Sequence, residues 1–255
     1  MKTIVSTLLL SCFLFTAALS AQSADAGVQF QKANAYFQDN EFDKAIETYE
    51  ALAAEGYQSA ELYYNLGNSY YRTDRLGKAI LYYEKALTLD GSDADIRYNL
   101  KVARDNTKNE ISPIPAFILL RWWWGVRQLA GSSFWAALGL LLFWLGVGGL
   151  IYWLMASDRQ QKKRGFVAGL SLLLVSALPF ALAYSRLSVE QNSRMAIVQR
   201  EVTSLRSAPD AASTEIKEVY EGLKVELLDQ IGDWSKVRLM DGEQGWLPME
   251  VYERI

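Results

Sequence analysis

Two long uncharged apolar segments constrain the fold of this chain more than any other feature. The first runs from Phe134 to Met155, and the second runs from Gly165 to Tyr184. A helix needs about 20 apolar residues to cross the roughly 30 Å hydrocarbon core of a bilayer, so each segment is long enough. Two buried core helices are the alternative, but no sequence of comparable length surrounds them to bury them. We therefore predict transmembrane helices at residues 134–155 and 165–185.

A short basic segment joins the two apolar segments. It is the octapeptide SDRQQKKR, within a predicted loop at residues 156–164, and four of its eight residues are basic. A loop this short makes the two helices antiparallel, and positive charge in short loops marks the cytoplasmic side of a membrane. We therefore expect both large flanking domains to lie outside the cytoplasm. In a two-membrane bacterium this means the periplasm, with the two spans in the inner (cytoplasmic) membrane.

The composition of the two predicted spans bears on their role. Neither contains an ionisable residue, and a transport path or proton relay usually needs one. Gly146, Gly148 and Gly149 would allow the two helices to pack closely. An anchor or a surface for partner helices is therefore favoured over a transporter.

Residues 1–21 have the pattern of a signal peptide. Lys2 precedes a short apolar run, and small residues follow it, so cleavage is expected between residues 20 and 26. A lipoprotein signal with Cys12 as the lipidated residue is the alternative, although the apolar run continues past Cys12. Export agrees with the orientation expected from the basic loop.

An internal sequence repeat precedes the first span. Laying residues 26–59 over 60–93 pairs similar residues at seven positions, among them Asn34 with Asn68 and Tyr49 with Tyr83. Each unit contains two segments of helical periodicity, separated by polar or Gly-containing turns. The second unit resembles the tetratricopeptide repeat at Tyr63, Leu66, Gly67, Tyr70, Ala79, Tyr83 and Ala86.

The resemblance implies helical hairpins over residues 26–110, closed by a capping helix at Asp95–Asn106. Proteins with this repeat bind peptides in a concave groove, and on that basis the groove candidates are Asn34, Asn65, Asn99 and Arg72. Asn34 and Asn65 match the Asn positions of members that clamp a terminal carboxylate, but the basic positions of those members are not matched. Carboxylate capture is therefore not expected, and solvated polar side chains are the alternative interpretation.

The segment at 111–133 combines a linker with a tryptophan cluster. Pro113 and Pro115 end helical structure, and RWWWGVR follows. Trp favours the headgroup level of a membrane, and Arg can reach lipid phosphates. A sugar-binding platform is disfavoured because adjacent Trp side chains on a helix point in different directions. We therefore expect an interfacial helix from Phe117 to Ala130, whose membrane-surface residues are Arg121, Trp122, Trp123, Trp124 and Arg127.

The segment at 194–255 changes to a strand-like alternation. Its short apolar runs, MAIVQ, LKVELLDQ, DWSKVRL and QGWLPM, are separated by turn signals such as Glu221-Gly222 and Asp241-Gly242. About 60 residues of short strands predict a small barrel. The order of Leu205–Pro209, Trp234–Arg238 and Gln244–Leu247 resembles bacterial SH3-like domains, which implies binding of peptides or cell-wall components. Trp234 and Trp246 are the candidate ligand residues, with partly buried barrel residues as the alternative.

The predicted fold class is multidomain α+β: tetratricopeptide-type helical hairpins, a two-helix transmembrane hairpin and a small all-β SH3-like barrel. The chemistry is limited because the chain has no His and its only Cys is Cys12. Their absence removes Ser-His and Cys-His nucleophilic sites, thiolate zinc sites and imidazole ligands. No phosphate-binding glycine loop occurs, and the acidic flanking domains offer nucleic acid no basic face. We expect no catalytic residue, no metal and no cofactor.

The whole arrangement resembles the BatE-like proteins of the Bat (aerotolerance) operon. The resemblance implies a non-enzymatic accessory of von Willebrand factor A-type membrane proteins and a MoxR-type ATPase, in envelope integrity or oxidative-stress tolerance. Two hypotheses remain beside a membrane-anchored scaffold for protein partners. One is a cell-envelope sensor whose SH3-like domain binds peptidoglycan, and the other is an enzyme, which the absence of His and Cys makes the least favoured.

Overall fold

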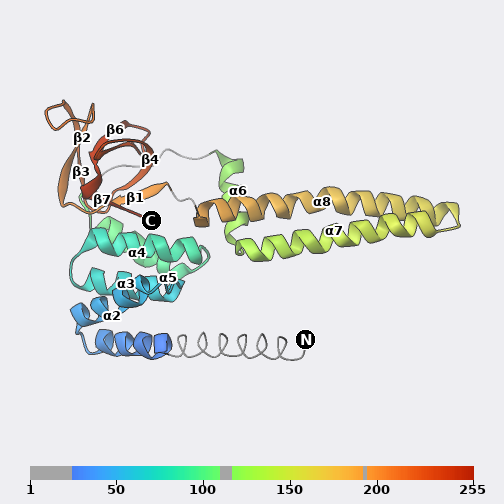
Figure 1. Ribbon diagram of the computed structural model, residues 1–255, viewed down its shortest axis with the longest axis horizontal. Helices are drawn as coiled ribbons and strands as arrows, with labels where there is room; N and C mark the ends of the chain where they lie inside the picture. The colour runs from blue at the N-terminus through green and yellow to red at the C-terminus, as the bar shows by residue number, and fades with distance from the viewer. Residues whose placement is uncertain (1–24, 110–116, 192–193) are drawn as a thin grey trace, which may run out of the picture.

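The computed structural model describes residues 25–109, 117–191 and 194–255. The predicted signal peptide, Cys12 and the two prolines of the linker lie outside these residues. Figure 1 shows N-terminal helices and a C-terminal sheet packed together at one end of a long two-helix hairpin. The predicted fold class is therefore confirmed, with helical hairpins, two candidate membrane helices and a small antiparallel sheet.

The N-terminal helices form stacked antiparallel hairpins. Residues 25–38 are helical, and four helices follow: α2 (Phe42–Ala54), α3 (Ala60–Arg72), α4 (Leu76–Leu89) and α5 (Ala94–Asp105). The turn inside each hairpin contains one residue in the left-handed region, Asn40 at φ 61° and Asp74 at φ 60°. Asn and Asp tolerate this region better than most residues. The two turns occupy the same position in the two repeat units, so the repeat in the sequence is also a repeat of the backbone.

Small residues let the helices of one hairpin approach closely. A Cβ atom at Gly67 would lie 2.7 Å from Cδ1 of Tyr83 and 3.3 Å from the carbonyl oxygen of Ala79. Any larger residue at position 67 would therefore separate α3 from α4. Helix α5, in the segment where the capping helix was predicted, packs on α4 at the end of the stack and buries Ile96, Leu100 and Ala103.

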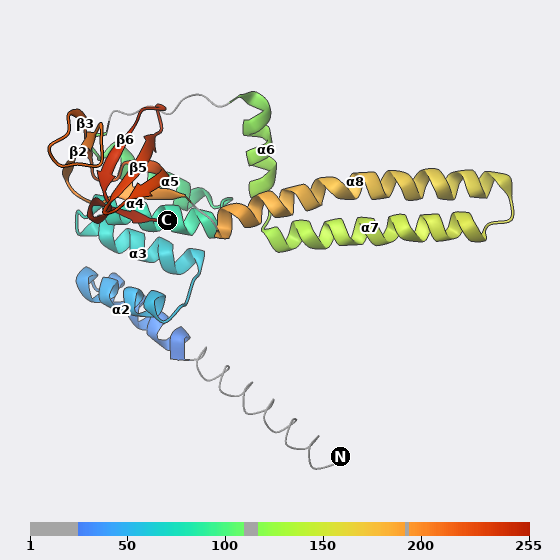
Figure 2. The ribbon, with the colours of Figure 1, turned by 45° about the horizontal axis from the view of Figure 1, so that its top comes forward.

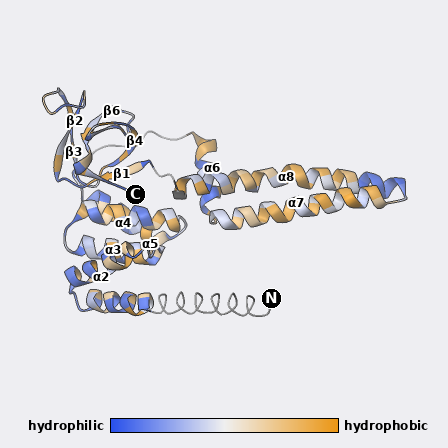
Figure 3. Cartoon of the chain, in the orientation of Figure 1, coloured by the Kyte–Doolittle hydropathy of each residue, from blue (hydrophilic) through white to orange (hydrophobic). Residues whose placement is uncertain are grey.

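The two apolar segments form helices α7 (Ser132–Met155) and α8 (Arg159–Gln191), which pack side by side along most of their length (Figures 1 and 2). Both are long and apolar enough to cross a membrane. In the most apolar stretch of each helix, only 11% of the residues of α7 and 22% of those of α8 are buried, whereas a core helix would be mostly buried. Figure 3 shows mostly hydrophobic residues along the two helices and hydrophilic residues at the tip between them.

The bounds of α8 differ from the predicted ones at both ends. Residues 159–164 were expected in a loop but form the first turns of α8, because the Asp158 carboxylate accepts the backbone N–H groups of Gln160 and Gln161 at 2.9 and 3.1 Å. At its other end α8 continues past residue 185 to Gln191. Its 33 residues extend about 50 Å, so α8 is longer than a hydrocarbon core is thick.

Glycines bring α7 and α8 into backbone contact. A Cβ atom at Gly149 would lie 2.8 Å from the Cα atom of Gly169, and one at Gly146 would lie 3.0 Å from the carbonyl oxygen of Gly169. Gly148 was also expected at this contact, but nothing lies within 4 Å of its Cβ position. It immediately precedes Gly149 and therefore points about 100° away around the helix.

The C-terminal domain is one strongly curved antiparallel sheet, in the spatial order β3-β2-β6-β5-β4-β1-β7. Alternate residues of β5 and β6 are buried, which produces the core of the domain. The apolar runs quoted from the sequence correspond to β1, β4, β5 and β6, whereas β2, β3 and β7 lack such runs. The bounds are β1 (Met195–Val198), β2 (Val202–Arg206), β3 (Glu215–Tyr220), β4 (Lys224–Ile231), β5 (Trp234–Leu239), β6 (Gln244–Pro248), η1 (Met249–Val251) and β7 (Tyr252–Arg254).

Candidate functional site

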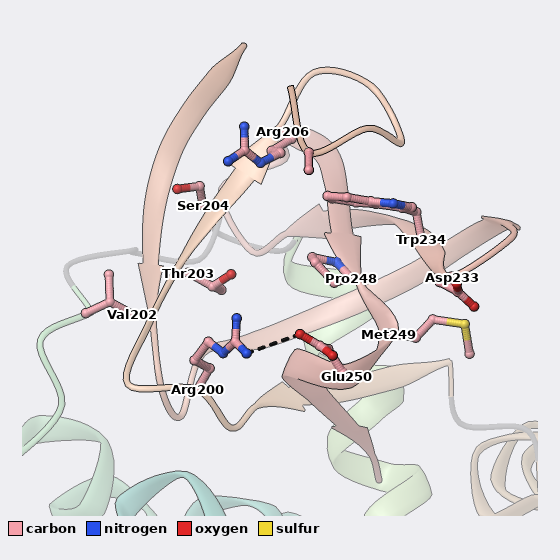
Figure 4. A pocket seen from close by; sticks show the side chains of 11 residues that line it. Arg200, Val202, Thr203, Ser204, Arg206, Asp233, Trp234, Pro248, Met249 and Glu250 are labelled. Carbon is pink, nitrogen blue, oxygen red and sulfur yellow. Dashed lines mark hydrogen bonds and ion pairs between the residues drawn. The ribbon is translucent and has the colours of Figure 1, made fainter. Parts of the chain in front are cut away.

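An open groove of about 750 Å³ crosses the outer face of the C-terminal sheet. Figure 4 shows Ser204 and Arg206 of β2 on one side, Trp234 at the start of β5 on the other, and Pro248 of β6 between them. The indole of Trp234 is half-buried. The groove therefore combines one flat aromatic side chain with hydroxyl and guanidinium groups, a combination that suits an extended peptide or a sugar-peptide.

Local hydrogen bonds hold the walls of the groove. Arg206 donates from Nη1 to the carbonyl oxygen of Ser213 at 2.7 Å, which fixes the loop between β2 and β3. The backbone N–H of Met249 donates to the carbonyl oxygen of Asp233 at 2.8 Å. At the other end, Arg200 pairs with Glu250 at 3.1 Å, and both side chains are exposed. An exposed pair of this kind opens readily, so Arg200 remains available to a ligand.

Trp246, the second candidate ligand residue, lies beside the groove but does not line it. Its neighbours Gly245 and Leu247 point into the core, and Trp246 points to the same outer face as Pro248. It pairs with Arg206 of β2 on one side and Lys236 of β5 on the other, and it is half-buried. The two tryptophans therefore share one face of the sheet, with Trp234 inside the groove and Trp246 next to it.

The asparagines expected in the peptide groove take part in hydrogen-bond networks between the helices. Asn34 Oδ1 accepts from the Tyr49 hydroxyl at 2.5 Å and from Asn65 Nδ2 at 3.1 Å. The next repeat reproduces this network at the equivalent positions, where Asn68 Oδ1 accepts from Tyr83 at 2.7 Å and from Asn99 at 3.0 Å. Each network ties one hairpin to the following helix. Burial raises the pKa of the Tyr49 hydroxyl to about 12, so it stays a neutral donor.

Arg72 and Asn99 line one small cavity of about 230 Å³, whereas Asn34 and Asn65 belong to the preceding network. The guanidinium of Arg72 stacks over the ring of Phe42 at 4.4 Å and donates to Asn40 at 3.4 Å. Its side chain remains exposed. Of the four groove candidates, Arg72 is therefore the one that presents a cation at the surface of the repeats.

Helix α6 (Ile118–Gln128) holds the tryptophan cluster and crosses the end of the hairpin at a steep angle (Figures 1 and 2). Trp122 is 64% exposed and Trp124 is 41% exposed, while Trp123 is half-buried. Arg121 is exposed, but Arg127 points toward α8 and donates from Nη1 to the Ser185 hydroxyl at 3.3 Å. Helix α6 thus presents an apolar surface at the level where α7 begins.

A buried carboxylate joins the helical repeats to the C-terminal sheet. Glu84 of α4 accepts from Lys224 of β4 at 2.7 Å and forms an ion pair with Arg104 of α5. Burial alone would raise the pKa of the Glu84 carboxyl, but these two cations hold it below its ordinary value. Sequence reasoning missed this cluster, although a Glu among the apolar residues of a helix was a signal for it.

Both ends of α4 are completed by other parts of the chain. The first residues of α4 have no side-chain cap of their own, and Glu221, in the turn between β3 and β4, accepts the backbone N–H of Gly77 at 3.0 Å. At the other end, Arg186 of α8 donates to the carbonyl oxygens of Thr88 and Leu89 at 2.8 and 3.4 Å. A carboxylate at the N-terminus and a cation at the C-terminus both complement the helix dipole.

Two regions of the chain match known families. Residues 30–94 match the tetratricopeptide repeat, and residues 201–251 match the bacterial SH3 domain. Both are interaction modules, for proteins or for peptidoglycan, and neither match includes α6, α7 or α8. No curated protein matches the chain. The chain therefore carries a tetratricopeptide repeat region and a bacterial SH3 domain, linked by a hairpin of two helices that are long and apolar enough to cross a membrane.

Proposed function

We propose that this chain is a non-enzymatic scaffold, anchored in the inner membrane by α7 and α8, which presents its repeats and its SH3 domain to protein partners in the periplasm. The single observation that carries this proposal is the docking of the SH3 domain on α4. The hydrogen bond from Lys224 to Glu84 joins the repeats and the SH3 domain into a single unit. No residue of α2 to α5 lines the groove on the SH3 domain, so this docking leaves the groove open.

The orientation rests on the charges at the tip of the hairpin. Arg159, Lys162, Lys163 and Arg164 occupy the first turns of α8, and all four side chains are exposed. Basic residues beside a span favour the cytoplasmic side. With the tip in the cytoplasm, the repeats and the SH3 domain both lie on the periplasmic side, because α7 begins and α8 ends at the opposite end of the hairpin (Figure 1).

The groove on the SH3 domain is the binding site in this proposal. Trp234 and Pro248 supply apolar contact area, while Arg200 and Arg206 supply hydrogen-bond donors. An aromatic ring and guanidinium groups are the side chains that most often dominate binding at protein interfaces. The resemblance to BatE-like proteins identifies the partners to test first, which are von Willebrand factor A-type membrane proteins and a MoxR-type ATPase complex.

Peptidoglycan binding is the alternative function, and the size of the groove favours it. A volume of about 750 Å³ lies within the range of small-molecule sites, and the Trp234 indole offers a flat surface for a sugar ring. On this alternative the chain is a cell-envelope sensor, and the groove is occupied by wall fragments rather than by a protein.

In-cell cross-linking separates the two functions. A photoreactive amino acid replaces Ser204 in the groove, and a matched variant carries it at Gln230, which is exposed and outside the groove. The scaffold proposal expects discrete protein adducts at position 204, absent at 230 and lost when Trp234→Ala is added. Wall fragments at position 204 without protein adducts support the alternative. Equal adducts at both positions would contradict any role for the groove.

A further inference from the structure

A second pocket, of about 1010 Å³, lies where α6, the end of α8 and the SH3 domain meet. We call it the junction pocket. Trp124 and Arg127 of α6 line it together with Ser188 of α8 and Lys224 of β4, and Thr88 of α4 closes one side. It shares no lining residue with the groove on the outer face of the sheet.

The charged side chains that line the junction pocket are all positive. Four are basic, Arg127, Arg194, Lys224 and Arg254, and no acidic side chain is among the lining residues that the structure describes. Lys224 is neutralised by Glu84 at 2.7 Å, whereas no ion pair among the described residues holds the other three. Positive charge is therefore in excess among the lining side chains that the structure describes.

Arg127 is half-buried, unlike the exposed Arg194 and Arg254. Within the described part of the chain, its buried Nε atom has no hydrogen-bond partner, while Nη1 donates to Ser185. A buried donor without a partner costs free energy. Burial and the positive charge of nearby Arg186 lower the pKa of Arg127. Both observations describe a guanidinium that an anion would stabilise.

The position of the pocket along the hairpin indicates which anion is available there. The uncharged segment of α8 ends at Tyr184, and Ser188 lies one helical turn beyond it, a rise of about 6 Å. This distance corresponds to the headgroup region next to the hydrocarbon core. The exposed indole of Trp124 at the pocket is typical of the same level.

We propose that the junction pocket binds the phosphate of an anionic phospholipid headgroup. Guanidinium groups bind phosphate oxygens through paired N–H donors, and Arg127, Arg194 and Arg254 supply them from α6 and from the SH3 domain. The lipid thereby bridges the interfacial helix and the folded domain. This inference rests on the proposed membrane anchoring, but it does not depend on what the SH3 groove binds.

The test is native mass spectrometry of the full-length protein in detergent, with phosphatidylglycerol and phosphatidylcholine supplied in equal amounts. The test variant is Arg194→Gln with Arg254→Gln, since both side chains are exposed and their loss leaves the core intact. The matched control is Arg159→Gln with Lys162→Gln, two exposed cations at the opposite end of the hairpin. A third variant, Arg127→Gln, probes the buried donor. Alkaline extraction of cell membranes measures anchoring separately.

The wild type is expected to retain phosphatidylglycerol in preference to phosphatidylcholine. Each charge removed from the pocket weakens retention about fivefold, so the test variant loses about 25-fold and the control pair is unchanged. Equal losses in the two pairs, or no preference for the anionic lipid, would overturn the proposal. Displacement by excess inorganic phosphate would identify a site for soluble anions and refute the lipid. If alkaline extraction releases the protein, the anchoring proposal fails instead.

Discussion

Replacing Glu84 by Gln tests whether the buried carboxylate holds the SH3 domain on the repeats. Gln keeps the shape and the hydrogen-bonding oxygen of Glu84 but removes its charge. Lys224 of the SH3 domain and Arg104 of α5 then face a neutral amide. If the ion cluster stabilises the docking, the two domains should separate more often in this variant while each domain keeps its own fold.

The expected magnitude follows from the exposure of the partners. A hydrogen bond to a charged group contributes about 1.5–3 kcal/mol, and only the bond from Lys224 crosses between the domains. The Lys224 side chain is 26% exposed, so water partly solvates it once the carboxylate is lost. A cost near the middle of the range is therefore expected, about 2 kcal/mol, which is about a 30-fold increase in the equilibrium constant for domain separation.

Glu253→Gln is the matched control in the same interface. Glu253 pairs with Lys78 and Lys85 of α4 at 2.6 and 3.6 Å, but its own side chain is 37% exposed. Partly exposed pairs of this kind contribute about 1 kcal/mol or less each. Hydrogen–deuterium exchange of peptides 195–199 and 221–228 in the full-length protein measures the separation. If Glu84→Gln changes this exchange no more than Glu253→Gln does, the buried cluster does not hold the interface.

Three further predictions concern pH, the hairpin and the repeats. Lys224 and Arg104 lower the pKa of the Glu84 carboxyl below its ordinary 4.5, so the ion cluster stabilises the docking fully above pH 4.5 and this stabilisation is lost as the pH falls through the lower folded-state pKa. Hydrogen–deuterium exchange measured from pH 6 downward should show this loss, and Glu84→Gln should abolish the pH dependence. Gly149→Ala should lower the stability of the hairpin in detergent by about 1–3 kcal/mol, because the added Cβ atom would contact the backbone of α8. Gly148→Ala is the control, since its Cβ atom would contact no neighbouring atom, and equal thermal midpoints for the two variants would contradict the close helix contact. Asn99→Ala should destabilise the repeats by about 1–2 kcal/mol, because it removes the hydrogen bonds from Asn99 to Tyr64 and Asn68. Asn106→Ala should cost less, because the hydrogen bond from Asn106 to Tyr71 is exposed. If the unfolding of Asn99→Ala is unchanged, Asn99 does not stabilise the repeats and its role is ligand binding alone.

Most elements of this fold were predictable because each of them carries a local sequence pattern. The helical repeats follow from the internal repeat of the sequence, the hairpin from two unbroken apolar segments, and most core strands from alternating burial. Gly67 at a close helix contact follows from the repeat itself. Strands β2 and β3 were not predicted as strands because they are half exposed and lack a continuous apolar run. Local periodicity therefore identifies elements whose burial is regular and misses strands whose burial does not alternate.

The candidate sites were less predictable because each depends on residues far apart in the sequence. Asn34 and Asn65 match groove positions of the repeat family, but position alone could not show that they bond each other and Tyr49. Trp234 was predictable from the SH3 pattern, whereas the β2 wall of its groove was not. In the junction pocket, the whole of α7 and α8 separates Arg127 from Arg194 in the sequence, and only the fold brings them together.

Helix α4 contacts both the SH3 domain and the end of the hairpin, and these contacts position the two relative to each other. Its N-terminus is capped by Glu221 of the SH3 domain, its middle holds Lys224 through Glu84, and its C-terminal carbonyls accept from Arg186 at the end of α8. Each contact satisfies a polar group that α4 cannot satisfy alone, and an unsatisfied buried group would cost free energy. The SH3 domain and the hairpin are therefore positioned by the same helix. A ligand that binds either the groove or the junction pocket acts on a body whose orientation above the hairpin is already set by α4.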